Sequence, residues 1–260
     1  MLFSDRPRSH YENAPVREVI CQLRFPPILS LNTMEPAAFQ EAIRDQFPQY
    51  ARRQDTPAPR MVPGNPPRME TVPPVTNYHF LSANNQWKLN LTKDFISLAT
   101  LRYPGWTTFA RMLDKPLAAF IEFYHPAYFQ RIGLRYINLF SRATLGLELS
   151  DWDELFTPAY LGVLGQPDVT EDALLQSGVD FRLKLDSSCQ CKVHSGISRT
   201  MPNGGPAPEE HFVLDIDLFM GGQVACTLAP GGLETLHGHG TRVFEGAITP
   251  LLRQAMQPAD

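Results

Sequence analysis

The stretch FQRIGLRYINLF, residues 129–140, carries the strongest strand pattern in this chain. Aromatic and β-branched residues dominate it, and such residues fit the pleated surface of a sheet. The stretch EVICQLRF, residues 18–25, has the same character and is ended by the pair Pro26-Pro27. We therefore predict two strands, each of which opens one half of the chain.

Helical and extended patterns follow each of these strands in the same order. In the first half we predict a helix at 34–53, strands at 78–82, 86–91 and 95–103, and a helix at 106–124. In the second half we predict a helix at 151–164, strands at 179–185, 189–199 and 211–219, and a helix at 233–256. The order strand, helix, three strands, helix thus occurs twice.

This order predicts an α+β fold. Two pseudo-repeated strand–helix–three-strand–helix halves would form a curved antiparallel sheet with helices on one face. The halves are residues 1–125 and residues 126–260, and we expect them to make one compact unit.

Residues 57–74, PAPRMVPGNPPRMETVPP, hold many of the 24 prolines of the chain. Proline fixes φ and lacks an N–H group, so such a stretch resists helix and favours extended conformations. We predict a plain connection that runs from the first helix to the next strand. A proline-rich ligand that docks on a partner is the alternative.

The composition is that of an ordinary globular protein, with 43% hydrophobic residues, a net charge of −4 and a pI of about 6.0. This mild acidity argues against a chain-wide electrostatic footprint for nucleic acid. Four cysteines are too sparse for a disulfide framework. The chain shows no signal-peptide pattern and no apolar run of roughly 20 residues. We therefore expect a cytoplasmic protein with no membrane contact.

Several arginines fall in or near predicted strands. Arg131 and Arg135 are an even number of residues apart and therefore share one face of their strand. Together with aromatic side chains they could line a groove for an anion or a nucleic acid. The predicted binding residues are Arg24, Trp87, Arg102, Tyr103, Arg131 and Arg135.

The interpretation that we favour is that these arginines form ion pairs with acidic residues of the same chain. Glu18, Asp215 and Asp217 lie on other predicted strands and could pair with them across the sheet. Asp215 and Asp217 alternate with apolar residues, so both project from one face. With His237 they could also serve a metal-assisted hydrolase. We favour the simpler interpretation, a strand with one apolar and one polar face.

Cys189, Cys191 and His194 come nearest to a metal cluster. The two sulfurs share a strand face, but His194 falls on the opposite face and no second ligand pair is apparent. His237 and His239 lack the i, i+4 spacing of a helical zinc motif. We predict no metal site and no cofactor.

Several segments resemble a sporadically distributed, functionally uncharacterised bacterial protein family of similar length. The most specific piece is RIGLRYIN at 131–138, and LDID at 214–217 adds to it. The pattern also has an N-terminal motif, which is matched by Tyr11, Pro15, Val16, Glu18 and Val19. Its C-terminal motif is matched by His237, Phe244, Glu245, Ile248 and Thr249. Gly238-His239-Gly240 departs from the pattern, which leaves a start of the last helix near Thr241 as an alternative to one at Leu233. The patchy distribution of the family implies phage-defence or CRISPR-linked operons.

The chain shows no P-loop, no G-x-G-x-x-G after a strand and no G-x-S-x-G elbow. We therefore predict a non-enzymatic binding or adaptor protein that acts through protein–protein contacts with another protein. A nucleic-acid-binding module and a metal-assisted hydrolase are the alternatives.

Overall fold

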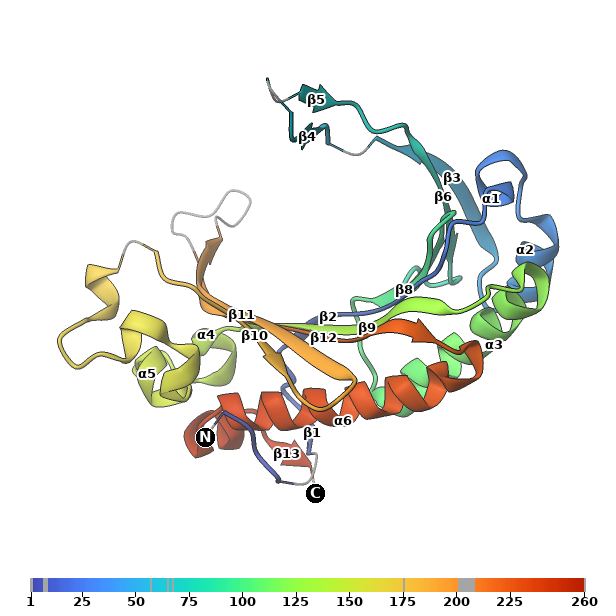
Figure 1. Cartoon of the computed structure of the whole chain (residues 1–260). Coiled ribbons are helices and arrows are strands. Elements are labelled where there is room, and N and C mark those ends of the chain that lie inside the picture. The colour runs from blue at the N-terminus through green and yellow to red at the C-terminus, as the bar shows by residue number, and fades with distance from the viewer. Residues whose placement is uncertain are drawn as a thin grey trace. The chain divides into compact units, whose positions relative to one another are not determined.

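The computed structural model describes residues 2–6, 9–56, 58–64, 66, 68–174, 176–200 and 209–259. Their main feature is an open antiparallel sheet of nine strands in the order β10-β11-β12-β9-β2-β8-β7-β6-β3 (Figure 1). This confirms the predicted α+β class. β2 and β9, the two opening strands of the repeat, are neighbours, and each is followed outward by strands of its own half.

The strands of the large sheet are β2 (Val16–Arg24), β3 (Gln49–Asp55), β6 (Val75–Leu81), β7 (Trp87–Leu91), β8 (Phe95–Thr100), β9 (Phe129–Phe140), β10 (Val179–Lys184), β11 (Cys189–Thr200) and β12 (Glu209–Val224). Two small sheets pair β1 (His10–Tyr11) with β13 (Pro258–Ala259) and β4 (Arg60–Val62) with β5 (Arg68–Glu70). The helices are α1 (Ser30–Thr33), α2 (Ala37–Ile43), α3 (Trp106–Tyr124), α4 (Arg142–Leu145), α5 (Trp152–Leu155), α6 (Ala229–Ala247) and α7 (Pro250–Ala255).

The chain divides into two compact units. Met1–Ile20, Gly133–Gly221 and Ala229–Asp260 form unit 1, and Cys21–Ile132 with Gly222–Leu228 form unit 2. These units do not test the predicted division into residues 1–125 and 126–260, which stays a prediction.

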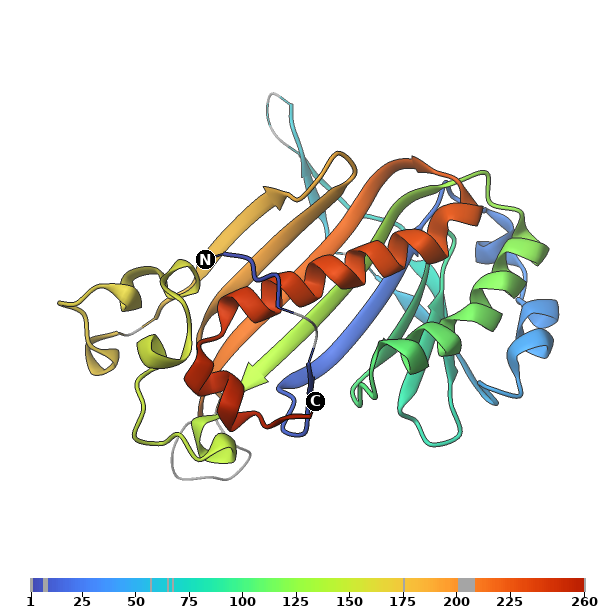
Figure 2. The same cartoon turned by 90° about the horizontal axis from the view of Figure 1, so that it is seen from below.

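In unit 1, α6 crosses the strands β9 and β12 on one face of the sheet (Figure 2). Its Phe244 packs on Tyr11 and on Phe140, with ring centroids 5.9 Å and 6.2 Å apart. From Phe212 to Leu218, every second residue of β12 faces the side of the sheet that α6 covers and is buried, as expected for a strand with one buried face. These residues are Phe212, Leu214, Ile216 and Leu218.

In unit 2, α3 covers the sheet with an aromatic stripe. Phe120 lies 4.6 Å from Phe25 on the segment that follows β2, and Phe109 lies 5.7 Å from Trp87 on β7. Phe39 of α2 packs edge-on against Phe80 of β6. The core of this unit is therefore built largely from ring contacts between helices and sheet.

The predicted helix at 34–53 is wrong beyond its first turns. α2 ends at Ile43, and Gln49–Asp55 form β3, which pairs with β6. Pro48 explains the break, because proline disfavours the α conformation of the residue before it and cannot continue the helical hydrogen bonds.

The proline-rich segment 57–74 was predicted to be a plain connection. The structure differs, because this segment contains the paired strands β4 and β5.

The helix predicted at 151–164 is also shorter. α5 covers Trp152–Leu155 and begins with a capping box between Asp151 and Glu154. Pro158 then opens the first of two short 3₁₀ turns, Pro158–Tyr160 and Gly162–Gly165. Proline at this position removes the N–H group that the helix would need to continue.

α6 runs through Gly238-His239-Gly240, so the alternative start near Thr241 is wrong. A Cβ atom on Gly240 would stand 3.1 Å from Leu218 Cδ1 and 3.2 Å from Tyr136 Cε2. Glycine therefore lets the helix approach the sheet closely there, which offsets its poor helix propensity. The helix does not continue to 256, since α7 starts anew at Pro250 with Thr249 as its N-cap.

Two glycines of α6 are expected to respond in opposite directions to alanine. A Cβ on Gly246 would stand 2.5 Å from the backbone oxygen of Leu2, so Gly246→Ala should lower the free energy of unfolding by about 1–3 kcal/mol. A Cβ on Gly238 meets nothing within 4 Å, so Gly238→Ala should raise it by up to ~1 kcal/mol. Urea denaturation of both variants tests this, and a stabilising Gly246→Ala would contradict the described path of the N-terminal segment.

Candidate functional site

Arg135 on β9 is held by Asp215 on β12. Its Nε lies 2.8 Å from Oδ1 and its Nη2 lies 2.5 Å from Oδ2, which makes a two-pronged ion pair. This hydrogen bond raises the pKa of Arg135, and the charges of Asp217 and Glu18 act in the same direction. Internal pairing, the interpretation that we favoured from the sequence, is confirmed for this arginine.

The other predicted binding residues lie in unit 2. Arg24 and Arg102 are exposed, and Arg131 is half-buried. Trp87 is buried against Phe109, so its ring is not presented to a nucleic-acid base. Tyr103 also packs on Phe109, at 6.0 Å between ring centroids. The two predicted stacking residues therefore serve the core of this unit.

The residues of the hydrolase hypothesis lie on opposite faces of the sheet. Arg135 and Tyr136 are successive residues of β9, so their side chains point to different faces. Asp215 binds Arg135, whereas His237 Nδ1 lies 2.7 Å from the hydroxyl of Tyr136. Since the sheet separates the aspartate from the histidine, the two cannot act on one substrate atom.

The motif residues that carried the family resemblance connect elements of unit 1. Asn138 is buried and donates from Nδ2 to the carbonyl of Leu214, at 2.9 Å. The Tyr11 hydroxyl donates to Glu245 Oε1 at 2.5 Å, and burial raises the pKa of this tyrosine. The N-terminal motif thereby binds the C-terminal one. These residues have structural roles that the sequence pattern alone did not reveal.

Three potential metal ligands converge at the turn between β10 and β11. They are Asp186 of this turn, Cys189 at the start of β11 and His239 of α6, and their ligand atoms all lie within 4.8 Å of one another. The sequence drew attention to Cys189 and His239 separately but missed Asp186. As predicted, His194 lies on the other face, where it contacts Asp180 at 3.0 Å. Only the packing of α6 on the β10–β11 hairpin brings the three residues together.

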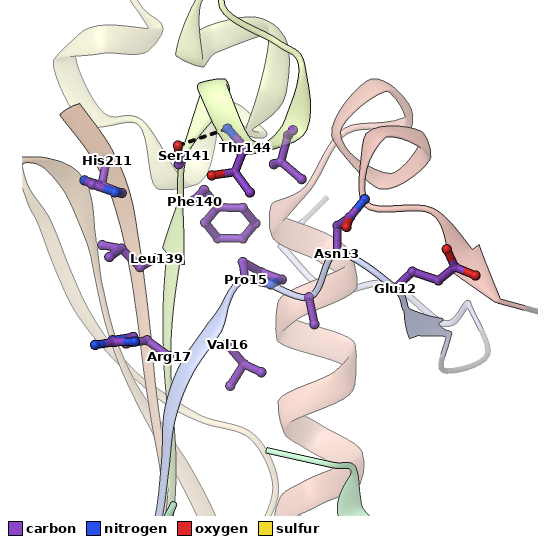
Figure 3. Close-up of a pocket in the computed structure, with 12 residues that line it drawn as sticks. Glu12, Asn13, Pro15, Val16, Arg17, Leu139, Phe140, Ser141, Thr144 and His211 are labelled. Carbon is purple, nitrogen blue, oxygen red and sulfur yellow. Dashed lines mark hydrogen bonds between the residues drawn. The ribbon is translucent and has the colours of Figure 1, made fainter. Parts of the chain in front are cut away.

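A cavity of about 330 Å³ lies at one end of β2 and β9 in unit 1 (Figure 3). The ionisable side chains that line it are Glu12, Arg17 and His211. In this view Arg17 and His211 lie on one side of Phe140, and Glu12 lies on the other. Ser141 is used in a cap, because its hydroxyl accepts from the N–H of Thr144. The cavity has the size of a small ligand site.

An apolar spot occurs on the hairpin tip formed by β4 and β5. Met61 and Met69 are directly opposite each other in this ladder, with exposed fractions of 69% and 64%. Residues directly opposite in an antiparallel pair lie on the same face. The tip therefore presents two adjacent apolar side chains to water, whereas isolated exposed apolar residues are ordinary.

Among the described residues, no helix combines the length and the apolar character that crossing a bilayer requires. Comparison with protein-family models finds no match to this chain, and comparison with curated proteins finds none that is significant. The function is therefore inferred from the geometry of the chain itself.

Proposed function

We propose that this chain is a non-enzymatic binding protein that holds another protein through the β4–β5 tip. The observation that carries the proposal is the exposed pair Met61 and Met69. Figure 1 shows β4 and β5 beyond the ends of β3 and β6, so the pair lies at the end of a hairpin arm.

The chemistry of the tip favours a protein partner. Methionine side chains are flexible and polarisable, so they adapt to apolar surfaces of varied shape. Burying a methionine side chain contributes about 1.5–3 kcal/mol. The strand β3, which leads into the arm, is almost entirely exposed and polar. An apolar spot at the end of a polar arm is therefore a small anchor for a partner.

The two rival functions have less support from the geometry. The nucleic-acid hypothesis needs unpaired cations beside exposed rings, but Arg135 is bound to Asp215 and Trp87 is buried. The hydrolase hypothesis needs Asp215 beside His237, and these lie on opposite faces of the sheet. The cytoplasmic location, the bacterial family and its phage-defence or CRISPR-linked setting stay proposals that rest on the sequence.

The double substitution Met61→Ser/Met69→Ser is expected to weaken partner binding by about 100-fold, because ~3 kcal/mol of apolar burial is lost. Both side chains are exposed, so the free energy of unfolding should change by no more than about 0.5 kcal/mol. The measurement is capture of partners from the native host by tagged chain, followed by mass spectrometry and titration of the recovered partner.

Met34→Ser is the matched control, since Met34 is 64% exposed but lies outside the arm. The proposal is supported if a stoichiometric partner binds the unchanged chain and the control but not the double variant. A partner that binds all three equally would place the contact elsewhere and overturn the role of the tip. Recovery of nucleic acid alone, with binding that falls steeply with salt, would favour the rival function.

A further inference from the structure

We propose that Asp186, Cys189 and His239 form a binding site for one zinc ion, with the fourth coordination position open to water or to an external ligand. The three residues share no position with the β4–β5 tip, so this inference does not depend on the proposed function. It rests on the geometry of the cluster, on the way its carboxylate is held and on the chemistry of its donors.

The ligand atoms already lie near the positions that zinc requires. His239 Nε2 is 2.9 Å from Asp186 Oδ2, and the Cys189 sulfur lies within 4.8 Å of both ligand groups. Tetrahedral zinc with ordinary bond lengths needs about 3.3 Å between nitrogen and oxygen and about 3.6 Å between nitrogen and sulfur. The nitrogen and oxygen would therefore separate by a few tenths of an ångström, and the sulfur would move inward by at most roughly 1.2 Å.

The carboxylate of Asp186 is oriented before any ion arrives. Its Oδ1 accepts from the backbone N–H groups of Ser188 and Cys189, both at 2.7 Å, and from the Ser188 hydroxyl at 3.0 Å. These bonds turn Oδ2 toward His239. Metal sites commonly use such hydrogen bonds from neighbouring groups to orient the residues that bind the ion.

The donor set also selects the ion. Nitrogen, sulfur and a single carboxylate suit a borderline-soft divalent metal, whereas calcium and magnesium prefer sites built of oxygen. When zinc binds, the Cys189 thiol forms the zinc–sulfur bond and releases its proton to solvent. His239 binds zinc through the lone pair of Nε2, with its ring proton on Nδ1, and Nε2 then gives up its hydrogen bond with Asp186 Oδ2. No oxidant or reductant is needed.

An ion can reach this site from solvent. The side chain of Asp186 is 36% exposed and that of His239 is 17% exposed, while Cys189 is fully buried. The carboxylate of the cluster is therefore accessible to solvent, whereas its thiol is not. Such a site combines an entry path with protection of the thiolate, two features expected of a metal site.

The test is titration of Zn²⁺ into the full chain after removal of metal by a chelator. We expect one zinc ion per chain by elemental analysis, and a thiolate-to-metal charge-transfer band when Co²⁺ replaces zinc. Asp186→Asn, Cys189→Ser and His239→Gln should each weaken zinc binding by more than roughly 10- to 100-fold, which is the cost of losing a residue that only supports a metal ligand. The cobalt charge-transfer band should vanish in Cys189→Ser.

Cys226→Ser and His194→Gln are matched controls, because both residues lie outside the cluster. Each should bind zinc like the unchanged chain. Absence of one-to-one binding, or binding that Cys189→Ser leaves unchanged, would overturn the site. If Cys189→Ser fails to fold, the half-exposed Asp186→Asn still decides the matter, since unaltered zinc affinity in that variant would equally overturn the proposal.

Discussion

Truncation of Phe156 to alanine is expected to lower the free energy of unfolding by about 3–5 kcal/mol. The Phe156 side chain is fully buried. It stacks on Phe212 at 3.9 Å between ring centroids and packs edge-on against Phe140 at 4.9 Å. Alanine would leave a cavity among these rings and remove their dispersion contacts. Since domains are stable by only about 5–15 kcal/mol, this one change should bring unit 1 close to unfolding.

Urea denaturation followed by circular dichroism and tryptophan fluorescence measures this loss. Trp152 lies 6.1 Å from Phe156, so its emission also reports local loosening of the cluster. Phe123→Ala is the control, because Phe123 is exposed on α3 and its loss should cost about 0.5 kcal/mol or less. A loss below ~1 kcal/mol for Phe156→Ala would contradict the close packing of Phe156 on Phe212 and Phe140.

Replacement of Arg142 by alanine is expected to have the next largest effect. Arg142 binds Glu171 Oε2 at 2.8 Å and Glu210 Oε1 at 2.9 Å, and its guanidinium lies 4.6 Å from the centre of the Trp152 ring. Alanine would leave two carboxylates without their cation in a largely buried site. Their side chains are 13% and 22% exposed, so we expect a loss of about 3 kcal/mol, at the low end for buried pairs.

The cost of Arg142→Ala should depend on pH. Burial raises the pKa of Glu171, and the Trp152 N–H and the charge of Arg142 offset this only in part. A carboxyl group whose pKa is raised in the native state stabilises the fold below its unfolded pKa, and this contribution is lost as pH rises through the native pKa. Without Arg142 the pKa of Glu171 rises further, so the variant should lose less stability at about pH 4 than at about pH 7.

Chemical denaturation of both proteins at the two pH values tests this dependence. Glu171→Gln added to Arg142→Ala should recover part of the stability at about pH 7, because the unpaired charge is then removed. An equal loss at both pH values, with no recovery in the double variant, would show that the ion pairs contribute little and that Arg142 acts by packing on Trp152.

The sequence by itself determined the elements whose signals are local. The bounds of α3 (Trp106–Tyr124) and β9 (Phe129–Phe140) match the prediction. Pro104-Gly105 precedes α3 and Pro126 separates it from β9, while Ser141 caps the helix that follows β9. The sequence also predicted that β6, β7 and β8 pair as antiparallel neighbours, because only short turns separate these strands along the chain. These features depend on neighbours within one window of the chain.

Tertiary structure decided the rest. β3 has the polar sequence QYARRQD and becomes a strand because β6 offers it a partner edge. Asp186 and His239 are 53 residues apart, and they meet because α6 packs across the hairpin to which Asp186 belongs. Arg135 and Tyr136 face opposite sides of the sheet and therefore serve different contacts. Such convergence depends on strand register and on the rotation of a helix about its axis, and both are set by packing between segments that are distant in the sequence.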